Sequence, residues 1–243
     1  MALFLSGGGD PPLTIALDEA FAVAVAARLV IYIPTALAGT ALFDGAGHWF
    51  SQTYGPLGVT TVDIWHDLDG RSLLSRDDLG GIYLGGGNTY LLLRELRRTG
   101  LDLELRALID RGVHVYGGSA GAIVLGSDIT TSDLGGDERV DSLADFAGLD
   151  VLSGWSVSCH YTRDHDPFLR RWTSDSSHSK ALLLCEDTGV VVESDQVRVL
   201  GQSGAGFQQG STAAWVTAGA HHWPPRLGAP DDSTSPDAGT EVH

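Results

Sequence analysis

The sequence is poor in cysteine and in basic residues, and it contains no long apolar run. Its two cysteines, Cys159 and Cys185, are too few for a disulfide framework or for a zinc site of cysteine and histidine. Lysine and arginine total 15 against 31 acidic residues, and the formal net charge of −16 opposes general binding to nucleic acid or anionic membranes. No window approaches the length of a membrane span, and the N-terminus lacks the basic and apolar regions of a signal peptide. We therefore expect a cytoplasmic protein that binds neither nucleic acid nor membrane.

Apolar residues make up 43% of the 243 positions, which is enough for one large domain with a sizeable core. Up to Leu125, short apolar segments alternate with segments of helical period. This alternation predicts an α/β fold in which a mainly parallel sheet is sandwiched between helices. The strands expected in this part are Ala2–Leu5, Leu29–Ile33, Val59–Trp65, Gly81–Leu84 and Val113–Tyr116. The expected helices are Leu13–Arg28, Phe43–Tyr54, Tyr90–Arg98 and Leu103–Arg111.

The remainder of the chain is richer in strands. The acidic segment Ser127–Leu143 is predicted to be a surface excursion. Two strands around Ser194 and Asp195 predict a C-terminal β-hairpin. Residues 1–223 are expected to form a single α/β domain, and residues 224–243, rich in proline, glycine, serine, threonine and aspartate, to be a disordered tail. The strands expected here are Val151–Val157, Ala181–Leu184, Gly189–Glu193, Gln196–Leu200 and Ala213–Val216.

The stretch Val113–Leu125 has the pattern of a strand that turns sharply into a helix with Ser119 at the corner. Small residues surround the serine because the turn is tight and a Cβ would clash. A serine hydroxyl at such a corner is exposed at the end of the sheet, beside the free amides of the helix that follows. The pattern is therefore that of a nucleophile, although an ordinary Gly-Gly-Ser turn would look the same locally.

Three glycine-rich turns, Gly7–Gly9, Gly85–Gly87 and Gly117–Gly118, follow expected strands. Because ligands bind at the carboxyl ends of parallel strands, these turns are candidates for one shared crevice. The amides that follow Gly85–Gly87 could bind an anion or a developing oxyanion. A phosphate-binding loop is disfavoured because no Lys-Ser/Thr follows, and the dinucleotide fingerprint has a different glycine spacing.

A serine nucleophile needs a base, and the base needs a group that orients it. Of the nine histidines, His160 follows a strand end and can face the same crevice as Ser119, with His165 as the neighbouring alternative. Glu186 follows the strand Ala181–Leu184 and could hold the imidazole, with Asp187 competing for that role. A solvent-exposed loop histidine and a solvated turn carboxylate remain the simpler interpretations of these residues.

Taken together, four segments resemble the serine peptidases known as peptidase E or aspartyl dipeptidases, a group that also includes cyanophycinase. The resemblance covers about residues 1–205, and the segments occur in the family's order and at similar separations. They are Ile82–Thr89, Tyr116–Ala122, Cys159–Thr162 and Leu184–Asp187.

The resemblance implies an α/β fold similar to the class I glutamine amidotransferases, which is flavodoxin-like. It implies Ser119 as the nucleophile, His160 as the general base and Glu186 as the third member of a catalytic triad. The backbone amides of Gly87 and Ala120 would form the oxyanion hole. Members of the family need no metal or organic cofactor, and several are dimers, which makes a homodimer a candidate assembly.

The chain departs from the family after the histidine. Peptidase E carries there a Gly-Glu-Thr-Arg segment whose arginine is tied to recognition of an N-terminal aspartate, and this chain has a shorter and different segment. If aspartyl specificity is kept, one of three arginines would pair with the substrate carboxylate. The residues expected to contact the substrate are Asn88, Arg163, Arg170 and Arg171.

We therefore expect a serine peptidase that hydrolyses small peptides through an acyl-enzyme, with dipeptides carrying an N-terminal aspartate as the narrower case. Two alternatives stay open at this point. The chain could be a non-catalytic module that keeps the amidotransferase-like shell and binds a small anion at the glycine turns. It could also cleave a polymer of aspartate and arginine, as cyanophycinase does.

Overall fold

Two β-sheets organise the chain in the computed structural model, which describes residues 1–175 and 180–224. Within these residues the larger sheet has eight strands in the order β12-β9-β8-β1-β5-β4-β2-β3. Pairing is parallel from β1 to β3 and antiparallel from β1 to β12. Its strands are β1 (Leu3–Ser6), β2 (Leu29–Ile33), β3 (Val62–Ile64), β4 (Leu79–Leu84), β5 (His114–Gly118), β8 (Thr188–Glu193), β9 (Gln196–Gly201) and β12 (Gly219–His222).

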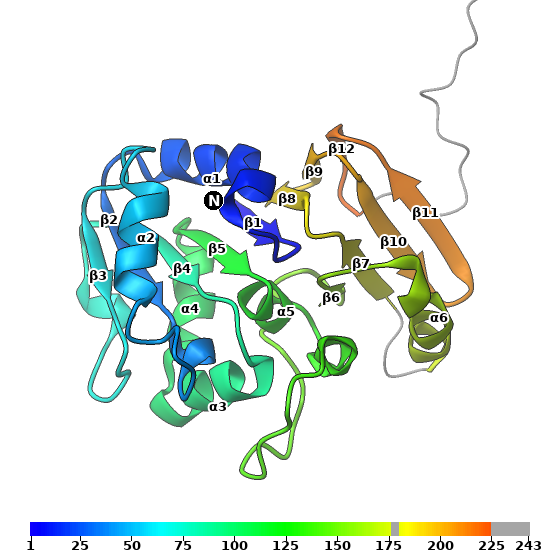
Figure 1. Cartoon of the computed structure of the whole chain (residues 1–243), viewed down its shortest axis with the longest axis horizontal. Helices are drawn as coiled ribbons and strands as arrows, with labels where there is room; N and C mark the ends of the chain where they lie inside the picture. The colour runs from blue at the N-terminus through cyan, green and yellow to red at the C-terminus, as the bar shows by residue number, and fades with distance from the viewer. Residues whose placement is uncertain (176–179, 225–243) are drawn as a thin grey trace, which may run out of the picture.

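Helices cover both faces of the larger sheet (Figure 1). Helices α1 and α2 share one buried core with the sheet, and α3, α4 and α5 share another. Strands such as β2 are buried at every position because both faces are covered. The helices are α1 (Pro11–Val25), α2 (Ala46–Tyr54), α3 (Thr89–Thr99), α4 (Leu101–Asp110), α5 (Ala120–Leu125) and α6 (Asp166–Ser174). Four short 3₁₀ turns complete the described helices: η1 (Thr35–Leu37), η2 (Leu73–Ser75), η3 (Thr130–Gly135) and η4 (Arg163–His165).

The smaller sheet lies beside the larger one and has four strands in the order β11-β10-β7-β6 among the described residues (Figure 1). Its inner residues join the core formed by α3, α4 and α5, and α6 packs on its other face through Leu169 and Trp172. Its strands are β6 (Ser156–Ser158), β7 (Lys180–Leu184), β10 (Ala205–Gln209) and β11 (Thr212–Val216).

The predicted mainly parallel sheet between helices and the β8–β9 hairpin are confirmed. The expected strand Val151–Val157 is wrong over its first part, because residues 151–154 form a turn and β6 begins at Ser156. The sequence does not predict that the strands divide into two sheets, and it predicts no strand at β10 of the smaller sheet or at β12 of the larger one. The tail expected from residue 224 onward lies outside the described residues, apart from Pro224 itself.

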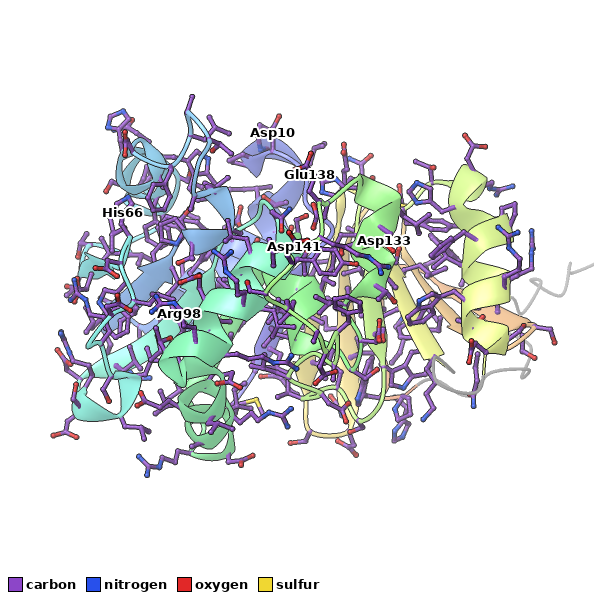
Figure 2. The ribbon with its side chains drawn as sticks, turned by 90° about the horizontal axis from the view of Figure 1, so that it is seen from below. Asp10, His66, Arg98, Asp133, Glu138 and Asp141 are labelled. Atoms are coloured by element: carbon purple, nitrogen blue, oxygen red, sulfur yellow. The ribbon has the colours of Figure 1, made fainter. Side chains whose placement is uncertain are left out.

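The segment Ser127–Leu143 is irregular and includes η3. Figure 2 shows its acidic residues Asp133, Glu138 and Asp141 together on one face of the molecule. The segment is not wholly at the surface, since Thr131 and Ser132 are buried in it. It is therefore an excursion that packs against the domain.

No helix within residues 1–175 and 180–224 has the length and apolar character needed to cross a membrane.

Candidate active site

Ser119 sits at the corner between β5 and α5, as the sequence predicts. Its backbone angles, φ 47° and ψ −105°, lie in a region that residues with a Cβ rarely adopt. This geometry is typical of a nucleophile elbow, in which a strained turn lifts the serine hydroxyl out of the strand end. The strain is maintained because α5 is buried at all six positions and cannot relax away from the sheet.

Gly121 explains why the corner needs small residues. A Cβ at this position would overlap the carbonyl oxygen of Leu84 and would lie 2.7 Å from the Leu84 side chain. The first turn of α5 therefore rests directly on the end of β4. This close approach brings the Gly85–Gly87 turn beside Ser119, and a Cβ at Gly86 would lie 3.5 Å from the Ser119 Cβ.

His160 reaches Ser119 from the smaller sheet. It follows β6, its backbone amide donates to the Gly7 carbonyl at 2.9 Å, and its own φ is +51°. The ring places Nε2 2.8 Å from the Ser119 Oγ. Gly8 packs against both residues, since a Cβ there would lie 2.5 Å from Nε2 and 3.1 Å from the Ser119 Cβ.

Glu186 completes a hydrogen-bonded series with His160 and Ser119. Strand β7, which precedes it, pairs in parallel with β6, so the two strands end side by side. The Glu186 Oε1 lies 3.0 Å from the His160 Nδ1. Because Nδ1 then carries the proton, Nε2 is free to accept the serine hydroxyl proton.

Asp187, the competing carboxylate, faces a different direction. Its Oδ2 accepts a hydrogen bond from the Ser203 hydroxyl at 2.9 Å, and its Oδ1 accepts one from Thr188 at 3.2 Å. Glu186 and Asp187 are the two central residues of the turn between β7 and β8, which the Thr188 amide closes by donating to the Cys185 carbonyl at 3.0 Å, and the turn directs their side chains apart. The geometry therefore pairs His160 with Glu186.

The site is open to water. The side chains of His160 and Glu186 are 39% and 60% exposed. Solvent screens the attraction between an exposed carboxylate and an imidazolium, so the contribution of Glu186 is chiefly one of orientation. In this respect the pair differs from a buried acid and base.

Two backbone amides near Ser119 have no hydrogen-bond acceptor among the described residues. Gly87 follows Gly86 in the glycine turn, and Ala120 is the first residue of α5. Within the described residues, no acceptor takes a hydrogen bond from either amide. Both amides are therefore free to donate, and they are the two that the family resemblance implies for an oxyanion hole.

Asn88 has a structural role that differs from the expected substrate contact. Its Oδ1 accepts from the Leu91 amide at 2.8 Å, which caps α3, and its Nδ2 donates to the Glu138 carbonyl at 2.8 Å. Asp137 accepts from the Thr89 amide at 2.8 Å. The segment Ser127–Leu143 thus holds the start of α3, and both ends of the Asn88 amide are occupied by the protein.

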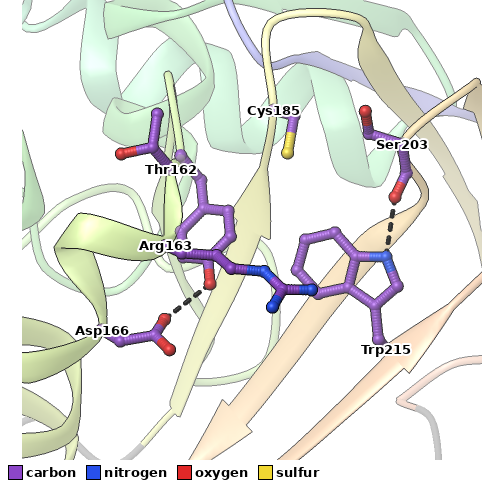
Figure 3. A pocket seen from close by; sticks show the side chains of 7 residues that line it. Thr162, Arg163, Asp166, Cys185, Ser203 and Trp215 are labelled. Atoms are coloured by element: carbon purple, nitrogen blue, oxygen red, sulfur yellow. Dashed lines mark hydrogen bonds between the residues drawn. The ribbon is translucent and has the colours of Figure 1, made fainter.

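A cavity of about 540 Å³ adjoins the site on the His160 and Glu186 side. Figure 3 shows Arg163 extending across it toward Trp215. The Tyr161 hydroxyl donates to Asp166 at 2.6 Å, and burial together with this bond raises the pKa of Tyr161 to about 12. The lining residues are Tyr161, Thr162, Arg163, Asp166, Cys185, Ser203 and Trp215.

The other two arginines are less suited to binding substrate. Arg170 is exposed and lies 3.8 Å from Asp166, one helical turn earlier. Arg171 is exposed, and within the described residues no acidic group pairs with it. Arg163 is therefore the one of the three expected arginines that lines the cavity beside His160.

Among the residues that the structure describes, no group of three His, Cys, Asp or Glu side chains is arranged to hold a metal ion. Cys159 is buried, with its sulfur 3.5 Å from the carbonyls of Ser6 and Ser119, and burial raises its thiol pKa well above the usual range. A thiol so protonated is a packing group rather than a nucleophile.

Two contributors to the site were missed from the sequence. The sequence pattern places Gly8 in a glycine turn but does not link it to His160, and it places Asp137 in a surface segment. The Gly7-Gly8-Gly9 run after β1 was the available signal for the first. Nothing local distinguishes Asp137 from the acidic residues around it, because its partner Thr89 lies 48 positions away.

Comparisons with known proteins show the family to which the chain is similar. The model of peptidase family S51 matches residues 3–200. A cyanophycinase of Synechococcus elongatus is 31% identical over 170 residues, covering 65% of this chain and 52% of the cyanophycinase, so the match spans about half of that relative. A peptidase E of Shewanella amazonensis is 29% identical over 164 residues, covering 64% of this chain and 67% of that protein.

A solved structure shows the same fold. The crystal structure of a peptidase from an acI-B1 Actinobacterium superposes with a TM-score of 0.72 at 20% identity, covering 91% of this chain and 96% of that one. The predicted fold class is thereby confirmed. Because the family match extends over most of the sequence and includes the corner at Ser119 and the strand ends at His160 and Glu186, the chain belongs to peptidase family S51.

Proposed function

We propose that this protein is a serine-type peptidase that hydrolyses small peptides through an acyl-enzyme. The observation that carries the proposal is the hydrogen-bonded series from Ser119 through His160 to Glu186, at distances of 2.8 and 3.0 Å. It begins at a strained corner that presents the hydroxyl beside two free amides. Family membership supports the same class of reaction.

In the first step, the Ser119 Oγ attacks the carbonyl carbon of the scissile peptide bond while its proton moves to the His160 Nε2. The negative charge then lies on the carbonyl oxygen, where the Gly87 and Ala120 amides donate to it. Losing one such donor typically costs on the order of 3 kcal/mol of transition-state stabilisation. Glu186 holds the Nδ1 proton of His160, which keeps the ring in the tautomer that accepts at Nε2.

In the second step, the carbon–nitrogen bond breaks as the His160 Nε2 returns its proton to the leaving amine. A water molecule then gives a proton to His160 and attacks the ester formed on Ser119. His160 then returns this proton to the Ser119 Oγ as the bond between the acyl carbon and that oxygen breaks, which releases the acid product and restores the serine. Atoms and charge balance with the chain, the substrate and one water molecule.

Arg163 supports a substrate that carries a carboxylate. Its guanidinium lines the cavity next to His160, and an arginine recognises a carboxylate through two parallel hydrogen bonds. A dipeptide with an N-terminal aspartate is the narrower candidate, and the terminal carboxylate of a dipeptide offers the same chemistry. The exposed Arg170 and Arg171 offer less support for either contact.

Covalent labelling tests the proposal directly. A fluorophosphonate probe reacts with activated serines, so we expect mass spectrometry of the labelled wild type to place the adduct on Ser119. Ser119→Ala should lose both labelling and cleavage of a dipeptide panel. Ser75→Ala, at the end of η2, is the matched control and should behave like the wild type.

Two results would contradict the proposal. If Ser119→Ala cleaves dipeptides as fast as the wild type, another residue is the nucleophile. Wild type that takes up no label and cleaves no dipeptide would favour the alternative of a non-catalytic module that binds small anions.

A further inference from the structure

Trp215 differs from the other residues that line the cavity beside His160, because a large apolar side chain is left in contact with water. The residue lies on β11 and is 41% exposed. It lines both the cavity of about 540 Å³ and a smaller one of about 180 Å³, and the two cavities also share Tyr161 and Asp166. The space beside His160 therefore continues along the indole.

The indole of Trp215 is fixed in place by the neighbouring strand β10. Gly206 is the partner of Trp215 in the strand register, and a Cβ at Gly206 would overlap the indole ring. A Cβ at Gly204, two residues earlier, would lie 2.8 Å from the indole nitrogen. The ring thus lies across β10 over two glycines, and its Nε1 donates to the Ser203 carbonyl at 2.7 Å. These contacts leave the ring one orientation.

The cavity begins within one residue of two members of the hydrogen-bonded series. Tyr161, which follows His160, lines it, and so does Cys185, which precedes Glu186. The ring centre of Tyr161 lies 5.5 Å from that of Trp215, with 40° between the ring planes. A substrate residue next to the scissile bond is therefore within reach of two fixed aromatic rings.

The charged side chains of the cavity do not select among neutral substrate side chains. They are Arg163 and Asp166, and Asp166 accepts a hydrogen bond from the Tyr161 hydroxyl at 2.6 Å. Figure 3 shows Arg163 and the indole of Trp215 on the same cavity. Arg163 can pair with a substrate carboxylate as proposed above, so selection among neutral side chains depends on the aromatic surface. A rigid tryptophan binds at a low cost in conformational entropy, and aromatic rings pair with it favourably.

We propose that Trp215 is a specificity-determining residue, which stacks against an aromatic side chain of a substrate residue next to the scissile bond. The inference rests on the proposed serine peptidase function. The bound ring would cover indole surface that water contacts in the free protein. The larger cavity, of about 540 Å³, has the size of a small-molecule site, for which roughly 300 to 1,000 Å³ is typical, and it has room for such a ring.

Two dipeptide series test the proposal and show which substrate residue Trp215 contacts. They are X-Ala and Ala-X, in which X is Phe, Leu or Gly. In one series we expect kcat/KM for Phe to exceed that for Gly about 20-fold and that for Leu about fivefold, because ring stacking adds to the burial of apolar area. A preference in X-Ala assigns the contact to the acyl residue, and one in Ala-X assigns it to the leaving residue. Equal values for Phe and Leu in both series would overturn the proposal.

A pair of variants at Trp215 locates the preference. Trp215→Leu keeps an apolar side chain without a ring and should lose the preference for Phe over Leu, whereas Trp215→Phe keeps a ring and should retain most of it. Trp49→Ala, on α2 at a residue of similar exposure, 38%, is the control and should leave the preference unchanged. The rate of fluorophosphonate labelling of Ser119 should be similar in all three variants, which shows that the site is intact. A preference that survives in Trp215→Leu would overturn the proposal.

Binding to Ser119→Ala separates this proposal from the proposed function. Calorimetric titration of that variant measures affinity without turnover, and we expect the favoured Phe dipeptide to bind about fivefold more tightly than its Leu counterpart. Selective binding without cleavage or labelling of the wild type would overturn the peptidase function and leave the role of Trp215 in place. Cleavage and labelling without selective binding would overturn the role of Trp215 alone.

Discussion

Replacing Gly8 by alanine should disable the candidate site while leaving the fold intact. Gly8 has a φ of +103°, and a Cβ at this position would lie 2.5 Å from the His160 Nε2. Unbonded heavy atoms are at rest about 3.5 Å apart, so the imidazole must shift by roughly 1 Å. The hydrogen bond between the His160 Nε2 and the Ser119 Oγ is 2.8 Å long, and this shift would lengthen it beyond hydrogen-bonding distance.

The expected loss of activity is large. A displacement of about 1 Å from the productive geometry costs on the order of 100-fold in rate. The positive φ adds a separate penalty of about 1 to 3 kcal/mol to folding, because alanine is strained there. Gly8→Ala should therefore lose about 100-fold in kcat/KM and in the rate of fluorophosphonate labelling, with a moderate fall in the unfolding midpoint.

Gly112→Ala is the matched control. Gly112 has a φ of +94°, and a Cβ there would meet no atom within 4 Å. The Gly112→Ala variant should show the same loss of stability from its positive φ and keep its activity. The comparison of the two variants therefore isolates the effect of the contact with His160. If Gly8→Ala labels Ser119 as fast as Gly112→Ala does, the packing of Gly8 against the imidazole has no catalytic consequence and the reasoning is refuted.

Three further predictions concern the Glu186 side chain, the packing of Gly121 and the buried carboxyl of Asp18. Glu186→Gln should lower kcat/KM roughly 10- to 100-fold by weakening the orientation of His160, while Asp187→Asn, which faces Ser203, should change it little; equal losses in the two would contradict the pairing. Gly121→Ala should cost about 3 kcal/mol in urea unfolding, because its Cβ would overlap Leu84, and an unchanged midpoint would count against that packing. Burial raises the pKa of the Asp18 carboxyl above its ordinary 3.8, so the folded state holds a proton that the unfolded state releases. The free energy of unfolding should therefore fall as pH rises from about 3.8 through the raised pKa. Urea titrations at successive pH values should show this slope in the wild type and not in Asp18→Asn.

The corner at Ser119 could be predicted because its information is local. Glycines and a serine between two apolar runs specify a strand, a tight turn and a helix, and the close approach of Gly121 to Leu84 is the physical reason for the pattern. The end of β7 could be placed for the same reason, because Ala181–Leu184 is a short apolar segment that ends two residues before Glu186.

The partners of these residues were harder to predict, since partner choice depends on the fold. Glu186 and Asp187 are adjacent and chemically alike, and only the conformation of the turn between β7 and β8 gives their side chains different partners. Asn88 belongs to a segment that resembles a substrate-binding turn, yet its side chain caps α3. Helix capping and substrate contact both use an amide at the same position, so the sequence supports either.

The smaller sheet was missed for a different reason. Strand β10 reads Ala-Gly-Phe-Gln-Gln, which has only one large apolar residue and a weak strand pattern. Its stability comes from antiparallel pairing on both sides, with β7 and with β11. Such pairing is a tertiary property, which no short window of sequence reveals.

The division of the site between two sheets has a mechanical consequence. Ser119 follows a strand of the larger sheet, whereas His160 and Glu186 follow strands of the smaller one. The His160 amide donates to the Gly7 carbonyl and the Gly9 amide donates to the Glu186 carbonyl, and these main-chain bonds join the two parts. The distance between nucleophile and base therefore depends on the relative position of the two sheets. A shift of one sheet by the width of a single atom would abolish activity while every strand kept its own hydrogen bonds. Heat or denaturant would inactivate such an enzyme by disturbing the contact between the sheets before the fold itself unfolds.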